Sequence, residues 1–193
     1  MNKEYVCDFA KKLLQIDSPT GYTKKAIAYV EEEAKRLGYE TKRNNKGNLW
    51  IYVNGKSKEK TIGLCAHCDT LGLMVRSIKS DGKLALTNLG GPIIPTLDGE
   101  YCRIYTRDGN VYTGTILSTS PATHVYKDAS TKVRDIDNIE VRIDEVVYAK
   151  EDTEKLGIQN GDIVAIDPKV QITESGFIKS RFLDDKISAS ALM

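Results

Sequence analysis

The chain has 193 residues, of which 40% are hydrophobic and 28% are charged, so it can bury one large core or two small ones and is not compositionally disordered. Its 28 Lys and Arg nearly balance its 27 Asp and Glu, which gives no indication of a nucleic-acid or anionic-membrane partner. No stretch approaches the roughly 20 apolar residues of a membrane span, and the charged N-terminus lacks a signal-peptide core. Four irregularly spaced cysteines favour reduced thiols. We therefore expect a cytoplasmic protein.

Two amphipathic helices are predicted at the start of the chain. Residues 3–16 place Phe9, Leu13 and further apolar residues three or four positions apart. The same spacing recurs over residues 23–37, and Gly38 follows where a helix C-cap belongs. After this glycine the apolar period changes to two, which predicts strands, including one through the apolar run GLCAHCDTLGLMV.

The following hundred residues predict a separate all-β unit. They contain short alternating runs and one short helix, and the pair Asp108-Gly109 lies where a hairpin turn is expected. A strand-like run, an acidic pair and a small-residue helix then close the sequence. We expect an α/β domain that opens, is interrupted by this unit and resumes near Val170.

His67 is one of two histidines, and Asp69 stands two positions later in the same predicted strand. Residues i and i+2 of a strand face the same way, so the Asp69 carboxylate could orient a metal-bound imidazole. A core histidine beside a capping Asp would give the same pattern. Cys65 and Cys68 form a C-x-x-C, but strand alternation points the two thiols to opposite faces, which favours packed thiols over a zinc knuckle or a redox pair.

Asp184 and Asp185 stand between a strand-like run and a small-residue helix. Open α/β sheets bind ligands at the carboxyl ends of their strands, and one carboxylate could bridge two divalent ions. The alternative is that both residues cap the helix and complement its dipole.

Five stretches in this order resemble the M42 family of metalloaminopeptidases, which includes the tetrahedral and glutamyl aminopeptidases. They are LLQIDSPTGY, LCAHCDTLGLMV, LGGPIIPTLDGEYCRIYTRDGNVYTGTI, KLGIQNGDIVAID and KSRFLDDKISASALM. The resemblance implies an incomplete zinc-peptidase-like α/β domain, residues 1–71 and 168–193, interrupted by an inserted β-barrel at residues 72–167.

The resemblance also implies the activity and the site. The expected enzyme removes N-terminal residues from short peptides with two divalent ions, zinc or cobalt by expectation, and forms homo-oligomers. His67 matches a metal-binding histidine, Asp69 the catalytic carboxylate that orients it, and Asp184 the bridging metal ligand.

The chain departs from the family pattern in one respect. In the family, the general base and the later metal ligands lie beyond the LDD helix, and this sequence ends at Met193. We therefore expect the chain by itself to be inactive and not to retain two ions. The main alternative is a non-catalytic assembly module centred on the β-barrel. A third possibility is a distinct hydrolase that uses only these residues.

Overall fold

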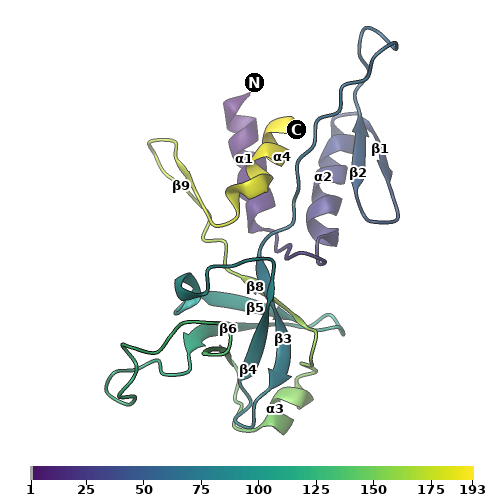
Figure 1. The fold of residues 1–193 in the computed structure, drawn as a ribbon. Helices are drawn as coiled ribbons and strands as arrows, with labels where there is room; N and C mark the ends of the chain where they lie inside the picture. The colour runs from purple at the N-terminus through teal and green to yellow at the C-terminus, as the bar shows by residue number, and fades with distance from the viewer. Residues whose placement is uncertain (1) are drawn as a thin grey trace. The chain divides into compact units, whose positions relative to one another are not determined.

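The computed structural model describes residues 2–193, and contacts divide the chain into two compact units (Figure 1). The terminal unit comprises the chain up to Thr70 together with Pro168–Met193, and the barrel unit comprises Leu71–Asp167. Helices and strands are both present, and six of the strands form a closed barrel, so the expected mixed α/β content is confirmed. No helix among residues 2–193 is long and apolar enough to cross a membrane.

The terminal unit contains three helices and two short antiparallel strand pairs. Its elements are α1 Lys3–Gln15, α2 Lys24–Arg36, β1 Glu40–Arg43, β2 Leu49–Tyr52, β9 Gln171–Ile172, β10 Ile178–Lys179 and α4 Leu183–Leu192. Strands β1 and β2 form one antiparallel pair, and β9 and β10 form another. Helix α2 ends as predicted, because Gly38 adopts a φ of 85° and Tyr39 N donates to Ala34 O at 3.0 Å.

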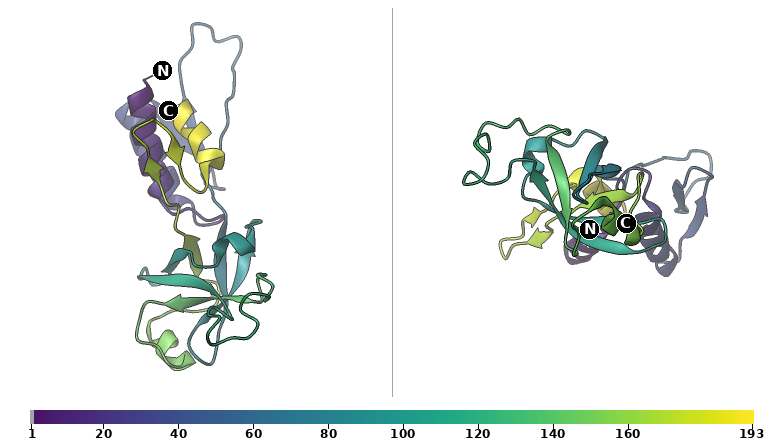
Figure 2. Two further views of the ribbon diagram at one scale, coloured as in Figure 1. Left: turned by 90° about the vertical axis from the view of Figure 1, so that its left-hand side faces the viewer. Right: turned by 90° about the horizontal axis from the view of Figure 1, so that it is seen from below.

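The core of the terminal unit lies where α1 packs against α2 and α4. Helices α1 and α4 lie side by side in the views of Figure 1 and Figure 2. The buried cluster combines residues far apart in sequence: Phe9, Leu13, Ala26, Val30, Cys68 and Ala189. The predicted helix periodicity is therefore confirmed by burial, since Leu13 is fully buried.

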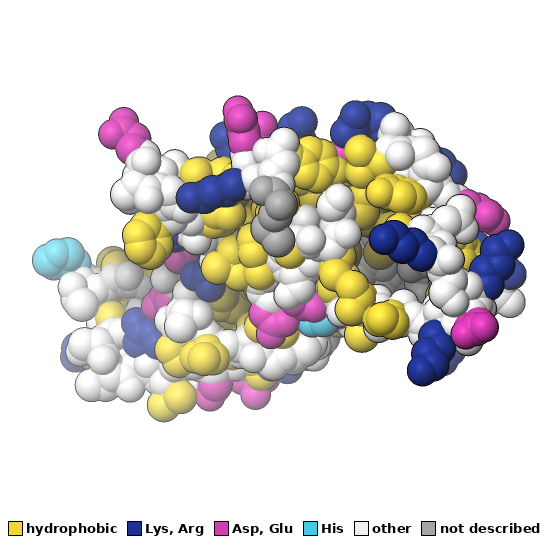
Figure 3. All heavy atoms as spheres, turned by 90° about the horizontal axis from the view of Figure 1, so that it is seen from above, with side chains coloured by type: hydrophobic (Ala, Val, Ile, Leu, Met, Phe, Trp, Pro, Cys, Tyr) yellow, Lys and Arg dark blue, Asp and Glu magenta, His cyan; other side chains and the backbone are white. Residues whose placement is uncertain are grey.

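The strand predicted through the run GLCAHCDTLGLMV, residues 63–75, forms only in its last part, from Gly72 onward. Residues 53–69 carry no assigned strand, and the isolated bridge that follows them pairs Thr70 with Pro19 in parallel. Ile62 and Leu64 are 87% and 75% exposed. Figure 3 shows hydrophobic side chains lying on the surface among charged ones at this end of the unit. A strand requires a hydrogen-bonded neighbour, and the apolar alternation by itself cannot supply one.

The barrel unit closes in the strand order β3-β4-β7-β6-β5-β8. Its elements are β3 Gly72–Ile78, β4 Leu84–Leu89, the 3₁₀ helix η1 Ile94–Leu97, β5 Tyr101–Tyr105, β6 Val111–Ser118, β7 Ile139–Ile143, α3 Lys150–Lys155 and β8 Ile163–Ile166. Alternate side chains of the strands fill the interior, including the fully buried Ile104 and Ile116. The predicted hairpin turn joins β5 to β6, with Gly109 at a φ of 89°.

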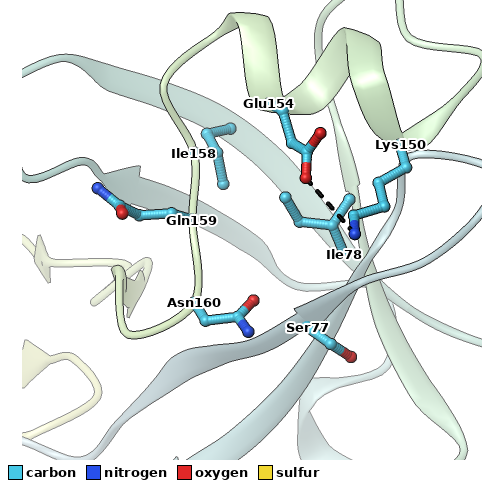
Figure 4. A pocket seen from close by; sticks show the side chains of 7 residues that line it. All are labelled: Ser77, Ile78, Lys150, Glu154, Ile158, Gln159 and Asn160. Atoms are coloured by element: carbon cyan, nitrogen blue, oxygen red, sulfur yellow. Dashed lines mark ion pairs between the residues drawn. The ribbon is translucent and has the colours of Figure 1, made fainter.

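The barrel unit has a shallow hollow of about 340 Å³ beside α3 (Figure 4). Seven residues line it: Ser77, Ile78, Lys150, Glu154, Ile158, Gln159 and Asn160. Its one carboxylate belongs to Glu154, which is paired with Lys150 at 3.5 Å. This lining contains no histidine or cysteine and therefore offers no imidazole or thiolate ligand to a metal ion.

Candidate metal centre

The three predicted site residues lie together in the terminal unit. His67 Nε2 is 3.3 Å from Asp184 Oδ1, although 117 positions separate the residues in the chain. On the other side of the ring, His67 Nδ1 is 3.0 Å from Asp69 Oδ1. The imidazole therefore stands between two carboxylates, with Asp184 almost fully exposed at 94% and Asp69 more enclosed at 38%.

A carboxylate behind a histidine fixes which ring nitrogen is available. The contact to Asp69 favours a proton on Nδ1, which leaves the lone pair of Nε2 directed toward Asp184. The second Asp69 oxygen, Oδ2, accepts a hydrogen bond from Thr20 Oγ1 at 2.7 Å. Thr20 was not among the residues that the sequence singled out.

Asp184 and Asp185 lie at the start of α4, where the backbone departs from helical geometry. Both have non-helical φ and ψ angles, the peptide bond between them is cis, and the N-terminus of α4 has no side-chain cap hydrogen bond. Instead, Asp185 Oδ2 accepts a hydrogen bond from the backbone N–H of His67 at 3.3 Å. Asp184 therefore faces the imidazole ring of His67, and Asp185 binds the backbone of the same residue.

Lys186 holds this end of α4 against α1. Its side chain is 1% exposed, and its Nζ donates to Leu13 O at 3.0 Å and to Ile16 O at 2.6 Å. These are carbonyls at the C-terminus of α1, where the helix dipole favours a cation. Burial lowers the pKa of Lys186 to about 8. The lysine thus anchors the start of α4, which carries Asp184 and Asp185, to the C-terminal end of α1.

The spacing of two of these groups fits a shared metal ion. Ligands about 2.0–2.1 Å from a tetrahedral zinc are roughly 3.3 Å apart, and His67 Nε2 and Asp184 Oδ1 have this separation. An imidazole nitrogen and a carboxylate oxygen also suit zinc and cobalt. Across residues 2–193, however, no group of three or more His, Cys, Asp or Glu side chains is arranged to hold an ion. Two candidate ligands are fewer than the four that a zinc centre needs.

The C-x-x-C pair shows no sign of redox or zinc chemistry. Cys65 is exposed and Cys68 is buried, and neither forms a disulfide. Burial raises the pKa of the Cys68 thiol, which makes the thiolate less accessible. Cys68 packs instead in the core of the terminal unit, in agreement with the packed-thiol alternative.

The chain is similar to known aminopeptidases in sequence and in fold. The family model of the M42 glutamyl aminopeptidases matches residues 47–193. YhfE of Bacillus subtilis (strain 168), a candidate aminopeptidase by its name, is 48% identical over 186 residues, which cover 96% of this chain and 54% of YhfE. Aminopeptidase APDkam598 of the archaeon Desulfurococcus kamchatkensis has 27% identity and a TM-score of 0.84, covering 99% of this chain and 52% of its own.

A further solved structure shares the fold. The TET1 peptidase of Pyrococcus horikoshii, described as assembling into a tetrahedron or a large octahedral shell, has a TM-score of 0.81 at 24% identity. The match covers 97% of this chain and 54% of that one. The chain thus spans about half the length of the relatives it matches.

Proposed function

Because the chain belongs to the M42 glutamyl aminopeptidase family, we propose that it forms part of a two-metal aminopeptidase that removes residues from the N-terminus of short peptides. The observation that carries this proposal is the pair His67 Nε2 and Asp184 Oδ1, set 3.3 Å apart with Asp69 behind the ring. His67 and Asp184 are the proposed metal ligands, and Asp69 orients His67. Divalent ions in such a centre supply a nucleophile at neutral pH and polarise the scissile carbonyl.

We infer that the 193 residues alone are inactive and do not retain two ions. The proposed metals are zinc or cobalt, each of which requires four or more ligands, whereas residues 2–193 bring only His67 and Asp184 together as candidate ligands. The contacts around His67 offer no further carboxylate in the position of a general base, because Asp69 and Asp185 are engaged with the imidazole and the backbone of His67. Additional protein groups would complete the centre.

The proposed domain organisation is an incomplete zinc-peptidase-like α/β domain interrupted by the barrel. The contact division at Thr70 and Asp167 supports it, since the segments before and after the barrel form one unit. We also propose a homo-oligomer, supported by the assemblies described for the TET1 peptidase. A cytoplasmic location is supported by the four free thiols, which suit a reducing compartment.

The test is a zinc titration of the purified chain by calorimetry, beside hydrolysis of an aminoacyl anilide. We expect weak binding that Asp184→Asn abolishes, because the neutral amide removes one of two ligands. We expect no turnover. Asp137→Asn in the barrel unit is the matched control, since that exposed carboxylate contacts Arg76 rather than the candidate centre.

The outcomes separate the alternatives. Zinc affinity that is equal in wild type and Asp184→Asn would refute the assigned ligands and favour the assembly module. Turnover by the purified chain that Asp184→Asn removes would refute the inference of an incomplete centre and favour a distinct hydrolase.

A further inference from the structure

We propose that Thr20 is a positioning residue whose hydroxyl fixes the Asp69 carboxylate and, through it, the tautomer of His67. This inference deepens the proposed function and depends on it for its relevance to metal binding. The proposed effect is on the metal-free protein, however, and it can be measured there independently.

The two oxygens of Asp69 have separate partners. Thr20 Oγ1 donates to Oδ2 at 2.7 Å, and Oδ1 faces His67 Nδ1 at 3.0 Å. A carboxylate with one free oxygen can rotate and present either oxygen, or neither, to the ring. The hydroxyl of Thr20 removes this freedom, because rotation would break a hydrogen bond to an ionised acceptor, which is stronger than one between neutral groups.

Backbone hydrogen bonds hold Thr20 in place independently of its side chain. Thr20 N donates to Thr70 O at 3.1 Å, and Thr70 N donates to Ser18 O at 2.8 Å. The buried hydroxyl of Ser18 donates to Cys68 O at 2.7 Å. The α1–α2 loop is thus attached to the segment that carries His67 and Asp69. The Thr20 side chain has one heavy-atom dihedral angle, χ1, and β-branching restricts it. Little side-chain entropy is therefore lost when the hydroxyl binds Asp69.

The fixed carboxylate determines which imidazole nitrogen carries the proton. A neutral imidazole donates from one nitrogen and accepts at the other. With Oδ1 held at Nδ1, the Nδ1–H form is favoured and the Nε2 lone pair stays free for a metal ion. Asp184 Oδ1 competes for a proton on Nε2, but its side chain is 94% exposed and its attraction is screened by water.

One other acceptor also faces Nδ1. The backbone carbonyl of Asp69 lies 3.2 Å from it and would remain after the carboxylate turned away. The variant Asp69→Ala therefore measures how far this carbonyl alone holds the tautomer. The effect of removing the Thr20 hydroxyl is expected to lie between wild type and Asp69→Ala.

The experiment records long-range ¹H–¹⁵N spectra of the ¹⁵N-labelled chain in a metal chelator at about pH 9, where histidine is normally neutral. Only two histidines contribute, so His124 in the barrel unit serves as an internal reference. The variants are Thr20→Val, which keeps the shape and removes the hydroxyl, Thr20→Ser, which restores it, and Asp69→Ala. Thr23→Val is the matched control, because Thr23 makes no side-chain cap hydrogen bond in the same loop.

We expect wild type, Thr20→Ser and Thr23→Val to show mainly the Nδ1–H form of His67, and Thr20→Val to lose part of it toward the Nε2–H form, with His124 unchanged in all. A general loss of structure would move both histidines. An unchanged His67 tautomer in Thr20→Val, or in Asp69→Ala, would overturn the proposal. Because no metal is present, that failure is distinct from a failure of Asp184→Asn to alter zinc affinity.

Discussion

Replacing Lys186 by methionine tests whether the buried lysine stabilises the terminal unit. The change keeps most of the side-chain volume and removes the ammonium group that donates to Leu13 O and Ile16 O. Losing two charge-assisted hydrogen bonds costs about 3–6 kcal/mol. Removing a buried charge offsets about 3 kcal/mol of this, because the fall in the pKa of Lys186 from 10.5 to about 8 measures how strongly the site disfavours the charged form. We expect a net destabilisation of about 0–3 kcal/mol, which is the cost of about 3–6 kcal/mol less the offset of about 3 kcal/mol.

The assay is urea unfolding followed by tryptophan fluorescence. Trp50 is the single tryptophan and lies in β2, so its signal reports on the terminal unit. Lys186→Ala serves as a second variant and is expected to be less stable than Lys186→Met, because it also loses the packing of the aliphatic stem. A Lys186→Met chain that is more stable than wild type would refute this balance, since desolvation of the ammonium group would then outweigh both hydrogen bonds.

Two further predictions concern stability in each unit. The hydrogen bond from Arg36, together with one from Tyr5, holds the pKa of Glu33 at about 2 against an ordinary 4.5, so this carboxylate stabilises the fold above pH 4.5 and the contribution is lost as the pH falls toward 2. Glu33→Gln should lower the free energy of unfolding at neutral pH by about 1–2 kcal/mol, a value reduced because the Arg36 guanidinium is exposed to water. The variant should also unfold with a weaker dependence on acid pH, as followed by Trp50 fluorescence. An acid profile unchanged from wild type would contradict this. In the barrel, a Cβ at Gly114 would lie 2.8 Å from Arg142 O. Gly114→Ala should therefore destabilise the barrel by about 1–3 kcal/mol, measured as faster hydrogen exchange of the β6 backbone amides. Gly91→Ala, which meets nothing within 4 Å, is its control, and equal protection in the two variants would contradict the steric argument.

Local patterns predicted the elements whose determinants are local. The spacing of Phe9 and Leu13 predicted the buried face of α1, and Gly38 ended α2 because the positive φ it adopts is accessible to glycine. The pair Asp108-Gly109 likewise predicted the β5–β6 turn. In each case the deciding interaction joins residues a few positions apart.

The contacts around His67 depend on partners far away in the sequence, which local patterns do not contain. The Thr20–Asp69 hydrogen bond spans 49 positions and the Lys186–Leu13 bond spans 173. The strand predicted through residues 63–75 forms only from Gly72 onward, because strand formation needs a neighbouring strand, which the earlier residues lack. His67, Asp69 and Asp184 could be named from the family resemblance. Thr20 and Lys186 also lie in stretches that carry this resemblance, but no local pattern indicated their contacts.

The most direct test of the central claim is to identify the metal ligands by NMR in the ¹⁵N-labelled chain loaded with ¹¹³Cd, which stands in for zinc. We predict scalar coupling between the ion and Nε2 of His67, none to Nδ1 or to His124, and loss of the coupling in Asp184→Asn. Coupling through Nδ1, coupling to His124, or a His67 spectrum that does not change at saturating cadmium would contradict the assignment of His67 and Asp184 to one metal centre.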